Sequence, residues 1–186
     1  MVLGSAGFFF VLLLDWLSLK NNAVLKRLCG LLSAGLVLYA TVMVCLAPDK
    51  YELPFFVLPP GIALAVVSFL LLIYSLFLEI PFHSTYAKKG VGDMLITTGT
   101  YALTRHPGVL WMGFFYIGLS IIFPSVIMFV AVAVWLIMDI SLVVLEDRFL
   151  FPRMFPGYDD YKKKTPFLIP TRQSLSNCRR TLRPGR

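Results

Sequence analysis

The feature that most constrains this chain is an apolar run from Val109 to Val144, in which Asp139 is the only Asp, Glu, Lys, Arg or His. At roughly 1.5 Å per residue, one straight helix of this run would be about 54 Å long, whereas the hydrocarbon core of a bilayer is about 30 Å thick. Pro124, near the middle, lacks a backbone N–H and favours a break. The run therefore predicts two short helices joined by a tight turn, which returns the chain to the face that it left.

The composition is that of an integral membrane protein. Of the 186 residues, 58% are hydrophobic and 15% are charged, whereas soluble domains carry about 25% charged residues. Three further apolar stretches precede the hairpin, at residues 2–19, 28–47 and 61–80. We therefore expect an all-α bundle of about five transmembrane helices, with residues 1–170 as a single domain and 171–186 as a basic, disordered tail.

The charges of the loops predict an orientation. Basic residues follow the first, third and fifth apolar segments, whereas the connection after the second is net acidic. The positive-inside rule then places the amino terminus outside and the carboxyl terminus in the cytoplasm. Because the chain is small and shows no targeting signal, we expect a bacterial plasma membrane rather than the endoplasmic reticulum.

The formal net charge of +7 indicates which partners to expect. The cationic excess lies from Arg148 onward, directly after apolar sequence, so we expect it to meet anionic lipid headgroups. Nucleic acid is not expected, because the aromatic-basic interleaving that stacks bases is absent. The three cysteines, Cys29, Cys45 and Cys178, are too few and too scattered to predict a metal site or a disulfide framework.

Ionisable residues flank the hairpin on both sides, at 105–107 and at 146–147. Because the hairpin returns to its starting face, we expect the two groups to lie together on the cytoplasmic side. Each of these two groups of residues also has an ordinary structural interpretation. A proline at the first helical position is favoured, an arginine anchors a helix entry, and the two carboxylates can pair with Arg105 or Arg148. We interpret Asp139 as a residue that hydrogen-bonds to a neighbouring helix, and we leave it out of the site.

Several short motifs surround these residues in a fixed order. They are Gly99-x-Tyr101-x3-Arg105-His106-Pro107, the hairpin, Glu146-Asp147-x2-Leu150, Gly157-Tyr158-x2-Tyr161 and Ile169-Pro170. In order and spacing, residues 93–170 resemble the isoprenylcysteine carboxyl methyltransferase and phospholipid methyltransferase superfamily. Its members are membrane-embedded enzymes that use S-adenosylmethionine without a Rossmann domain, and this chain has no usable G-x-G-x-x-G.

The resemblance implies a cytoplasmic site for S-adenosylmethionine. It implies that Glu146 binds the polar end of the cofactor and that Tyr101 packs on it. We expect Arg105 and His106 to neutralise the carboxylate of the cofactor. The further residues implied to line the cofactor are Asp93, Met94, Leu95, Ile96, His106, Pro107, Gly108 and Val109. Our candidate catalytic residues are Glu146, Asp147 and Arg105.

Four positions depart from the pattern of this superfamily. Val109 and Trp111 stand where Tyr and Gly are usual, so one cofactor contact is lost. Asp147 replaces the usual Glu, with the same charge and a shorter reach. Leu142 stands where isoprenylcysteine methyltransferases carry an arginine for the substrate carboxylate, which argues against a prenylcysteine substrate.

The sequence thus predicts a membrane methyltransferase that transfers the methyl of S-adenosylmethionine to a lipophilic acceptor, a lipid, an isoprenoid or a small thiol or carboxylate, which enters from the bilayer. Two alternatives stay open. The first is an NADPH-dependent lipid reductase, because sterol reductases resemble this superfamily in their C-terminal helices. A non-catalytic scaffold or lipid-binding protein of the same fold is the other, and the changes at Val109 and Trp111 favour it.

Overall fold

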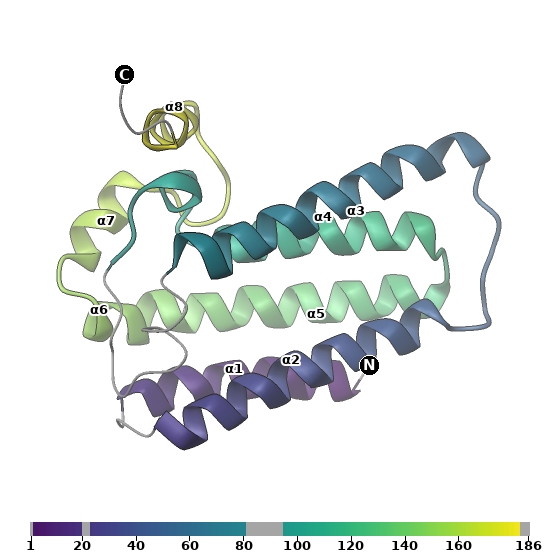
Figure 1. Ribbon diagram of the computed structural model, residues 1–186, viewed down its shortest axis with the longest axis horizontal. Helices are drawn as coiled ribbons and strands as arrows, with labels where there is room; N and C mark the ends of the chain where they lie inside the picture. Colours follow the sequence, from purple (N-terminus) through teal and green to yellow (C-terminus); the bar gives the residue numbers. More distant parts are fainter. Residues whose placement is uncertain (1, 20–22, 81–94, 183–186) are drawn as a thin grey trace.

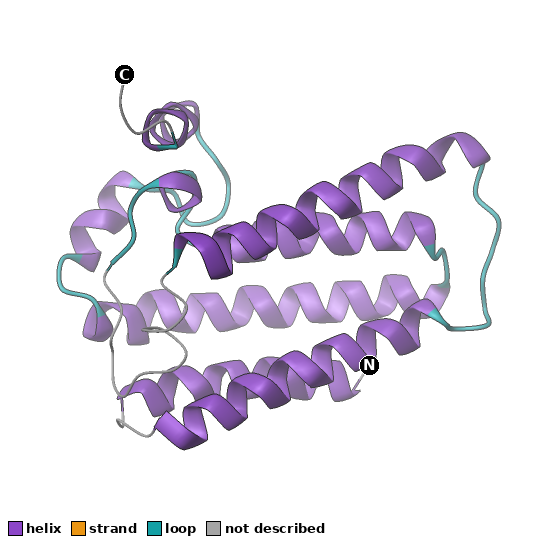
Figure 2. Cartoon of the chain, viewed as in Figure 1, coloured by secondary structure: helices purple, strands orange, loops and turns teal. Residues whose placement is uncertain are grey.

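The computed structural model describes residues 2–19, 23–80 and 95–182, and all regular elements in these three ranges are helices (Figure 2). The long helices run side by side, and the short C-terminal helices gather at one end of the bundle (Figure 1). The N-terminal end of the first helix points toward the opposite end. The predicted all-α fold is therefore confirmed.

The first two helices, α1 (Val2–Leu19) and α2 (Ala23–Cys45), pack along each other. In the other half of the bundle, α3 (Leu58–Ile73) packs on α4 (Pro107–Ile122). The helix α5 (Val126–Leu145) contacts α1, α2 and α4, so it joins the two pairs.

Shorter helical elements complete the described chain. One turn of 3-10 helix, η1 (Phe55–Val57), precedes α3, and α3 continues as the π-helical η2 (Tyr74–Glu79). The remaining elements lie near the end that carries the candidate site. They are the 3-10 turn η4 (Gly99–Ala102), the π-helical η5 (Glu146–Leu150), and the helices α6 (Phe151–Met154), α7 (Tyr158–Lys164) and α8 (Arg172–Thr181).

The hairpin predicted from the long apolar run is present. The turn Phe123-Pro124-Ser125 joins α4 to α5. The Ser125 side chain caps α5 by accepting the backbone N–H of Met128 at 3.0 Å. Both ends of the hairpin therefore lie at the same end of the bundle (Figure 1).

Large apolar side chains and small residues fit together where the helices meet. Trp135 and Met128 of α5 and Tyr116 of α4 are almost fully buried in the largest core cluster. Gly118 lets α4 approach α3 closely, because a Cβ at this position would lie 2.7 Å from the backbone nitrogen of Ala65. Close approach at small residues is the usual way in which membrane helices gain packing contacts.

Within the described ranges, three helices are long and apolar enough to cross a membrane, namely Val24–Cys45, Phe55–Glu79 and Val126–Met154. Two shorter apolar helices cover Val2–Leu14 and Pro107–Ile122. Large apolar side chains are exposed along the outside of these helices, as expected for a surface that faces lipid. These features support a membrane protein, whereas five crossings and the orientation of the two ends stay predictions.

The predicted start of the third helix is wrong by one turn. α3 begins at Leu58 rather than at Gly61, so Pro59 and Pro60 fall in its first turn. The backbone N–H groups of a first turn have no partner within the helix, so the donor that proline lacks is not missed there. α2 likewise begins earlier than expected.

The expectation of disorder over residues 171–186 is wrong for the described part of this tail, which forms α8. The Thr171 hydroxyl accepts the N–H of Ser174 at 3.1 Å, and the Ser174 hydroxyl accepts the N–H of Thr171 at 2.9 Å. This capping box fixes the start of the helix. Cys178, one turn later, packs against η4. Composition alone does not reveal such local signals.

Candidate functional site

The candidate site lies at the end of the bundle where η4, η5 and α7 meet the start of α4 (Figure 1). Pro107 occupies the first position of α4, so Arg105 and His106 directly precede the helix. The backbone N–H of Arg105 donates to the carbonyl of Pro166 at 2.9 Å, which ties this segment to the chain after α7. The hairpin returns η5 to the same place, as predicted for the two ionisable groups.

The carboxylate of Asp147 is the centre of this site. Its Oδ1 accepts the hydroxyl of Tyr158 at 2.7 Å and lies 3.3 Å from Nη1 of Arg105. Its Oδ2 lies 3.2 Å from Nζ of Lys162. Nε2 of His106 is 3.5 Å from Oδ1, too far for an ordinary hydrogen bond. Side chains from two segments, the residues before α4 and the helix α7, therefore converge on one buried carboxylate of η5.

Glu146 and Asp147 are both buried, although they are neighbours in a helical segment. Successive side chains of a helix point roughly a quarter of a turn apart, so two neighbours are buried together only where other segments cover two sides of the helix. α1 packs on η5. The α7 residues Tyr158 and Lys162 cover Asp147. The burial of both carboxylates thus depends on the bundle and on the C-terminal segment together.

The imidazole of His106 lies between aromatic rings. It stacks on Phe151 with 5.7 Å between ring centroids, and the ring of Phe167 meets it edge-on at 5.1 Å. Burial lowers the pKa of His106 below its usual value, and the neighbouring Asp147 opposes this shift only in part. His106 therefore contributes a neutral ring near pH 7.

The helix α7 links η5 to η4 through two tyrosines. Burial, followed by the hydrogen bond to Asp147, raises the pKa of Tyr158 above its usual value, so its hydroxyl stays a donor. The hydroxyl of Tyr161 donates to the carbonyl of Tyr101 at 2.6 Å. Tyr158 and Lys162 were not among the predicted site residues. The spacing of the two tyrosines, three apart on one helix face, was the signal for the first of them.

Three successive residues carry buried polar atoms without a hydrogen-bond partner among the described residues. They are Oγ1 of Thr104, Nε of Arg105 and Nε2 of His106. A buried polar atom that lacks a partner costs roughly 1–3 kcal/mol, so such atoms are rare in native proteins. Their grouping beside Asp147, in the turn that also carries Glu146, marks a place where a polar ligand would be stabilised.

A second polar network holds η4 against the end of α3. The backbone N–H of Thr100 donates to both carboxylate oxygens of Glu79, at 2.8 and 3.1 Å, and the Thr100 hydroxyl also donates to Glu79. Because the single hydroxyl proton of Thr100 is used there, the Ser75 hydroxyl is the donor in its 2.9 Å contact with Thr100. The indole N–H of Trp111 donates to the Ser75 hydroxyl at 3.0 Å. Each donor in this chain therefore points toward Glu79.

This network explains one departure from the superfamily pattern. Trp111, where Gly is usual, completes the chain of donors and packs beneath η4 with Leu110. Glu79 was missed as a candidate because it was treated as part of an expected helix. A carboxylate at the end of a long apolar helix is the same signal that singled out Glu146 and Asp147.

The structure brings together part of the predicted site. Arg105 and His106 surround Asp147, and Glu146 belongs to the same turn. The other predicted cofactor-lining residues differ in exposure: Pro107 and Val109 are buried, whereas Leu95, Ile96, Tyr101 and Gly108 are half-buried. Asp93 and Met94 lie outside the described residues. Within the described ranges, no three His, Cys, Asp or Glu side chains are grouped to hold a metal ion.

Comparisons with known proteins agree with the resemblance seen in the motifs. About half of the chain, residues 58–153, matches the model of the phospholipid methyltransferase family. A stretch of 76 residues is 30% identical to the nickel-cobalt-cadmium resistance protein NccN of Alcaligenes xylosoxydans xylosoxydans, covering 41% of this chain and 36% of that protein. The match thus spans about a third of the length of NccN. No solved structure matches the chain.

The family match contains the elements on which the site is built. It runs from the start of α3 through η2, η4 and the hairpin to η5 and α6, and so includes Glu79, Arg105, His106, Glu146 and Asp147. The helix α7, with Tyr158 and Lys162, lies beyond it. The protein belongs to the phospholipid methyltransferase family.

Proposed function

We propose that this protein transfers the methyl group of S-adenosylmethionine to a lipophilic acceptor that it takes from the bilayer. The observation that carries the proposal is the group of buried polar atoms without a described partner at Thr104, Arg105 and His106, next to Asp147 in the turn that also carries Glu146. It lies within the part of the chain that matches a methyltransferase family. When bound, S-adenosylmethionine supplies a methyl carbon made electrophilic by its sulfonium.

The chemistry of the donor set fits the polar part of this cofactor. Nε of Arg105 is an N–H donor that suits a carboxylate, while the carboxylate of Glu146 suits an ammonium group. Oγ1 of Thr104 and Nε2 of His106 suit hydroxyl groups such as those of a ribose. Asp147 is already surrounded by Arg105, Tyr158 and Lys162, so its role is to hold Arg105 and η5 in place.

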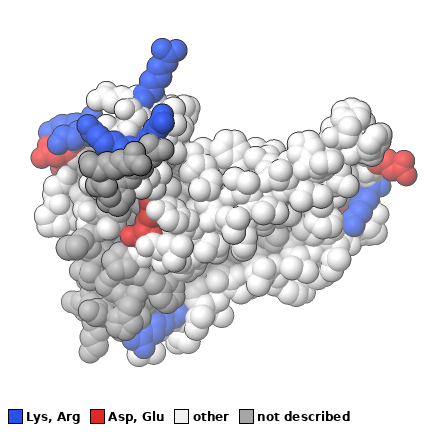
Figure 3. All heavy atoms as spheres, turned by 45° about the horizontal axis from the view of Figure 1, so that its top comes forward, with Lys and Arg blue, Asp and Glu red and all other residues white. Residues whose placement is uncertain are grey.

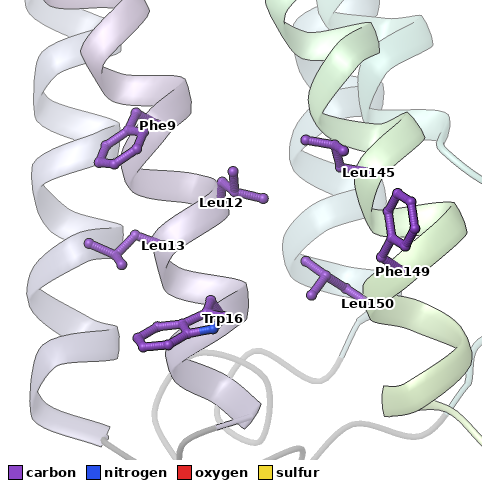
Figure 4. Close-up of a pocket in the computed structure, with 7 residues that line it drawn as sticks. All are labelled: Phe9, Leu12, Leu13, Trp16, Leu145, Phe149 and Leu150. Carbon is purple, nitrogen blue, oxygen red and sulfur yellow. The ribbon is translucent and has the colours of Figure 1, made fainter.

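An apolar groove beside the site supports a lipophilic acceptor. It lies between α1 and the α5–η5 segment, where Leu12 faces Leu145 and Leu150 (Figure 4). Its volume is about 310 Å³, and all its lining side chains are apolar, namely Phe9, Leu12, Leu13, Trp16, Leu145, Phe149 and Leu150. Three of them belong to the same turns as Glu146 and Asp147. A hydrocarbon chain seated here would hold its head beside these carboxylates.

Methyl transfer depends more on alignment and exclusion of water than on acid–base groups. The site is suited to this, because Glu146, Asp147 and His106 are buried although they lie at the end of the bundle. The aromatic rings of Phe151 and Phe167 cover the imidazole on two sides. These residues would orient the reactants and keep water away from the reacting groups.

The test is equilibrium binding of S-adenosylhomocysteine, S-adenosylmethionine and NADPH to the detergent-purified protein. We expect micromolar binding of both adenosyl ligands and at least tenfold weaker binding by Glu146→Gln. Arg105→Lys keeps the positive charge near Asp147 but removes the Nε donor, so it should also weaken binding. Asp160→Asn is the matched control, because Asp160 is an exposed carboxylate on α7.

The second stage measures transfer of labelled methyl from S-adenosylmethionine to a total lipid extract. Incorporation that Glu146→Gln abolishes would support the proposal. Binding of the adenosyl ligands without incorporation into any lipid fraction would favour the non-catalytic scaffold. Binding of NADPH alone would favour the reductase, and equal binding by Glu146→Gln and wild type would refute the proposed site.

A further inference from the structure

The helix α8 lies across the end of the bundle. It is seen end-on in Figure 1, whereas the long helices run across the picture. Its inward face carries Ser174 and Cys178, which are buried, and the half-buried Thr181. These residues follow the i, i+4, i+7 spacing of a single helix face. If the long helices cross a bilayer, α8 therefore lies roughly in the plane of its surface.

The outward part of α8 has an apolar edge with arginines beside it. Leu175 and Leu182 are 54% and 45% exposed. At about 100° per residue, Arg172 and Arg179 project from the stripe next to these leucines, and both are exposed. Arg180 projects toward the other side of the helix. Lys and Arg side chains gather over this end of the molecule, above an apolar body (Figure 3).

The last turn of α8 is joined to η4. The hydroxyl of Thr181 accepts the backbone N–H of Gly99 at 2.9 Å. Gly99 has a φ of +61°, in the left-handed region that glycine adopts without strain, and it begins the turn that carries Thr100 and Tyr101. The position of α8 is therefore coupled to the position of η4.

We propose that α8 is an interfacial helix that binds anionic lipid headgroups through Arg172 and Arg179, with Leu175 and Leu182 at the acyl boundary. Leucines embedded beside arginines that reach the phosphates are typical of helices that lie in a membrane interface. The headgroup is favoured as the occupant because the exposed edge is both apolar and cationic and lies at the end of an apolar bundle. Binding would steady η4 through Thr181. This inference does not depend on the proposed methyl transfer.

The test is amide hydrogen exchange of the full chain in nanodiscs of phosphatidylcholine alone or with about one third phosphatidylglycerol. Each arginine at an anionic surface is expected to slow exchange of the α8 amides by about fivefold. Arg179→Gln should lose the roughly fivefold slowing that Arg179 provides, whereas the neighbouring Arg180→Gln should keep the protection of the wild type. Both substitutions remove one positive charge from an exposed side chain, on different faces of the helix, and Arg180→Gln also removes an exposed hydrogen bond to the Asn177 side chain. High salt should abolish the protection in the wild type.

Other arms of the experiment separate the possible causes. Inorganic phosphate added to phosphatidylcholine discs should not reproduce the protection, because it offers no apolar boundary to Leu175 and Leu182. Thr181→Val should leave the α8 protection intact but release the amide of Gly99. Equal exchange in the two kinds of disc, or equal losses in Arg179→Gln and Arg180→Gln, would overturn the proposal.

Discussion

Asp139 and Asp147 lie two turns apart on the continuous α5–η5 helix and are equally buried, yet their surroundings are opposite. Asp147, at the end of the bundle, has Arg105, Tyr158 and Lys162 within reach of its oxygens. Oδ2 of Asp139, among apolar side chains, has no hydrogen-bond partner in the described ranges. Burial alone therefore does not indicate whether a carboxylate stabilises the fold. The hydrogen-bond and ion-pair partners of the carboxylate decide this.

The largest expected effect follows from removing the partnered carboxylate. Asp147→Ala should lower the free energy of unfolding by about 3–5 kcal/mol, because it leaves the cations of Arg105 and Lys162 without their buried partner. Thermal unfolding in detergent measures the change. Asp160→Ala is the control, since its ion pair with Lys163 is fully exposed and should contribute nothing measurable. Equal stability of the two variants would contradict the central position of Asp147.

Substitution of Asp139 should change the free energy of unfolding in the opposite direction. Asp139→Val should raise the free energy of unfolding by about 1–3 kcal/mol, because an apolar side chain suits the interior of the bundle better than a carboxyl group with an unpaired oxygen. Asp139→Asn, which keeps the shape and a polar group, should change stability much less. The same unfolding measurement applies. A loss of stability in Asp139→Val would mean that Asp139 has a structural partner or binds a ligand.

The same contrast shows which parts of the fold the sequence predicts well. The hairpin follows from two local facts, namely a run too long for one crossing and Pro124 near its middle. The hairpin in turn predicts that Arg105 and Asp147 lie at the same end of the bundle, which the structure confirms. Length and a helix-breaking residue are enough for such predictions, because they do not depend on side-chain contacts.

Contacts between distant segments were not predictable in the same way. The hydrogen bonds of Thr100 with Glu79 and of Tyr158 with Asp147 depend on how η4 and α7 fold over the bundle. No local pattern specifies that geometry. The helix α8 was missed for another reason, since its basic and polar composition is typical of disorder, whereas its capping box and the buried Cys178 stabilise a helix.

The smallest expected effect concerns His106 and can be measured from pH 8 down to pH 5. Burial lowers its pKa, so below about pH 6.5 the unfolded chain binds a proton that the folded chain does not. The contribution of His106 to the free energy of unfolding should therefore be fully present above that pH. It should fall as the pH decreases, by at most about 1.4 kcal/mol per pH unit, until the lowered pKa is reached.

His106→Phe is the control for this pH dependence. It keeps the stacking on Phe151 and should remove the slope, and the difference between the two curves separates the effect of His106 from that of His83. Asp147 is the group that opposes the shift, so in Asp147→Asn the decline should continue to lower pH than in the wild type. An unchanged slope in His106→Phe would show that the imidazole is not held neutral by its surroundings, and the contrast between Asp147 and Asp139 would then rest on the carboxylates alone.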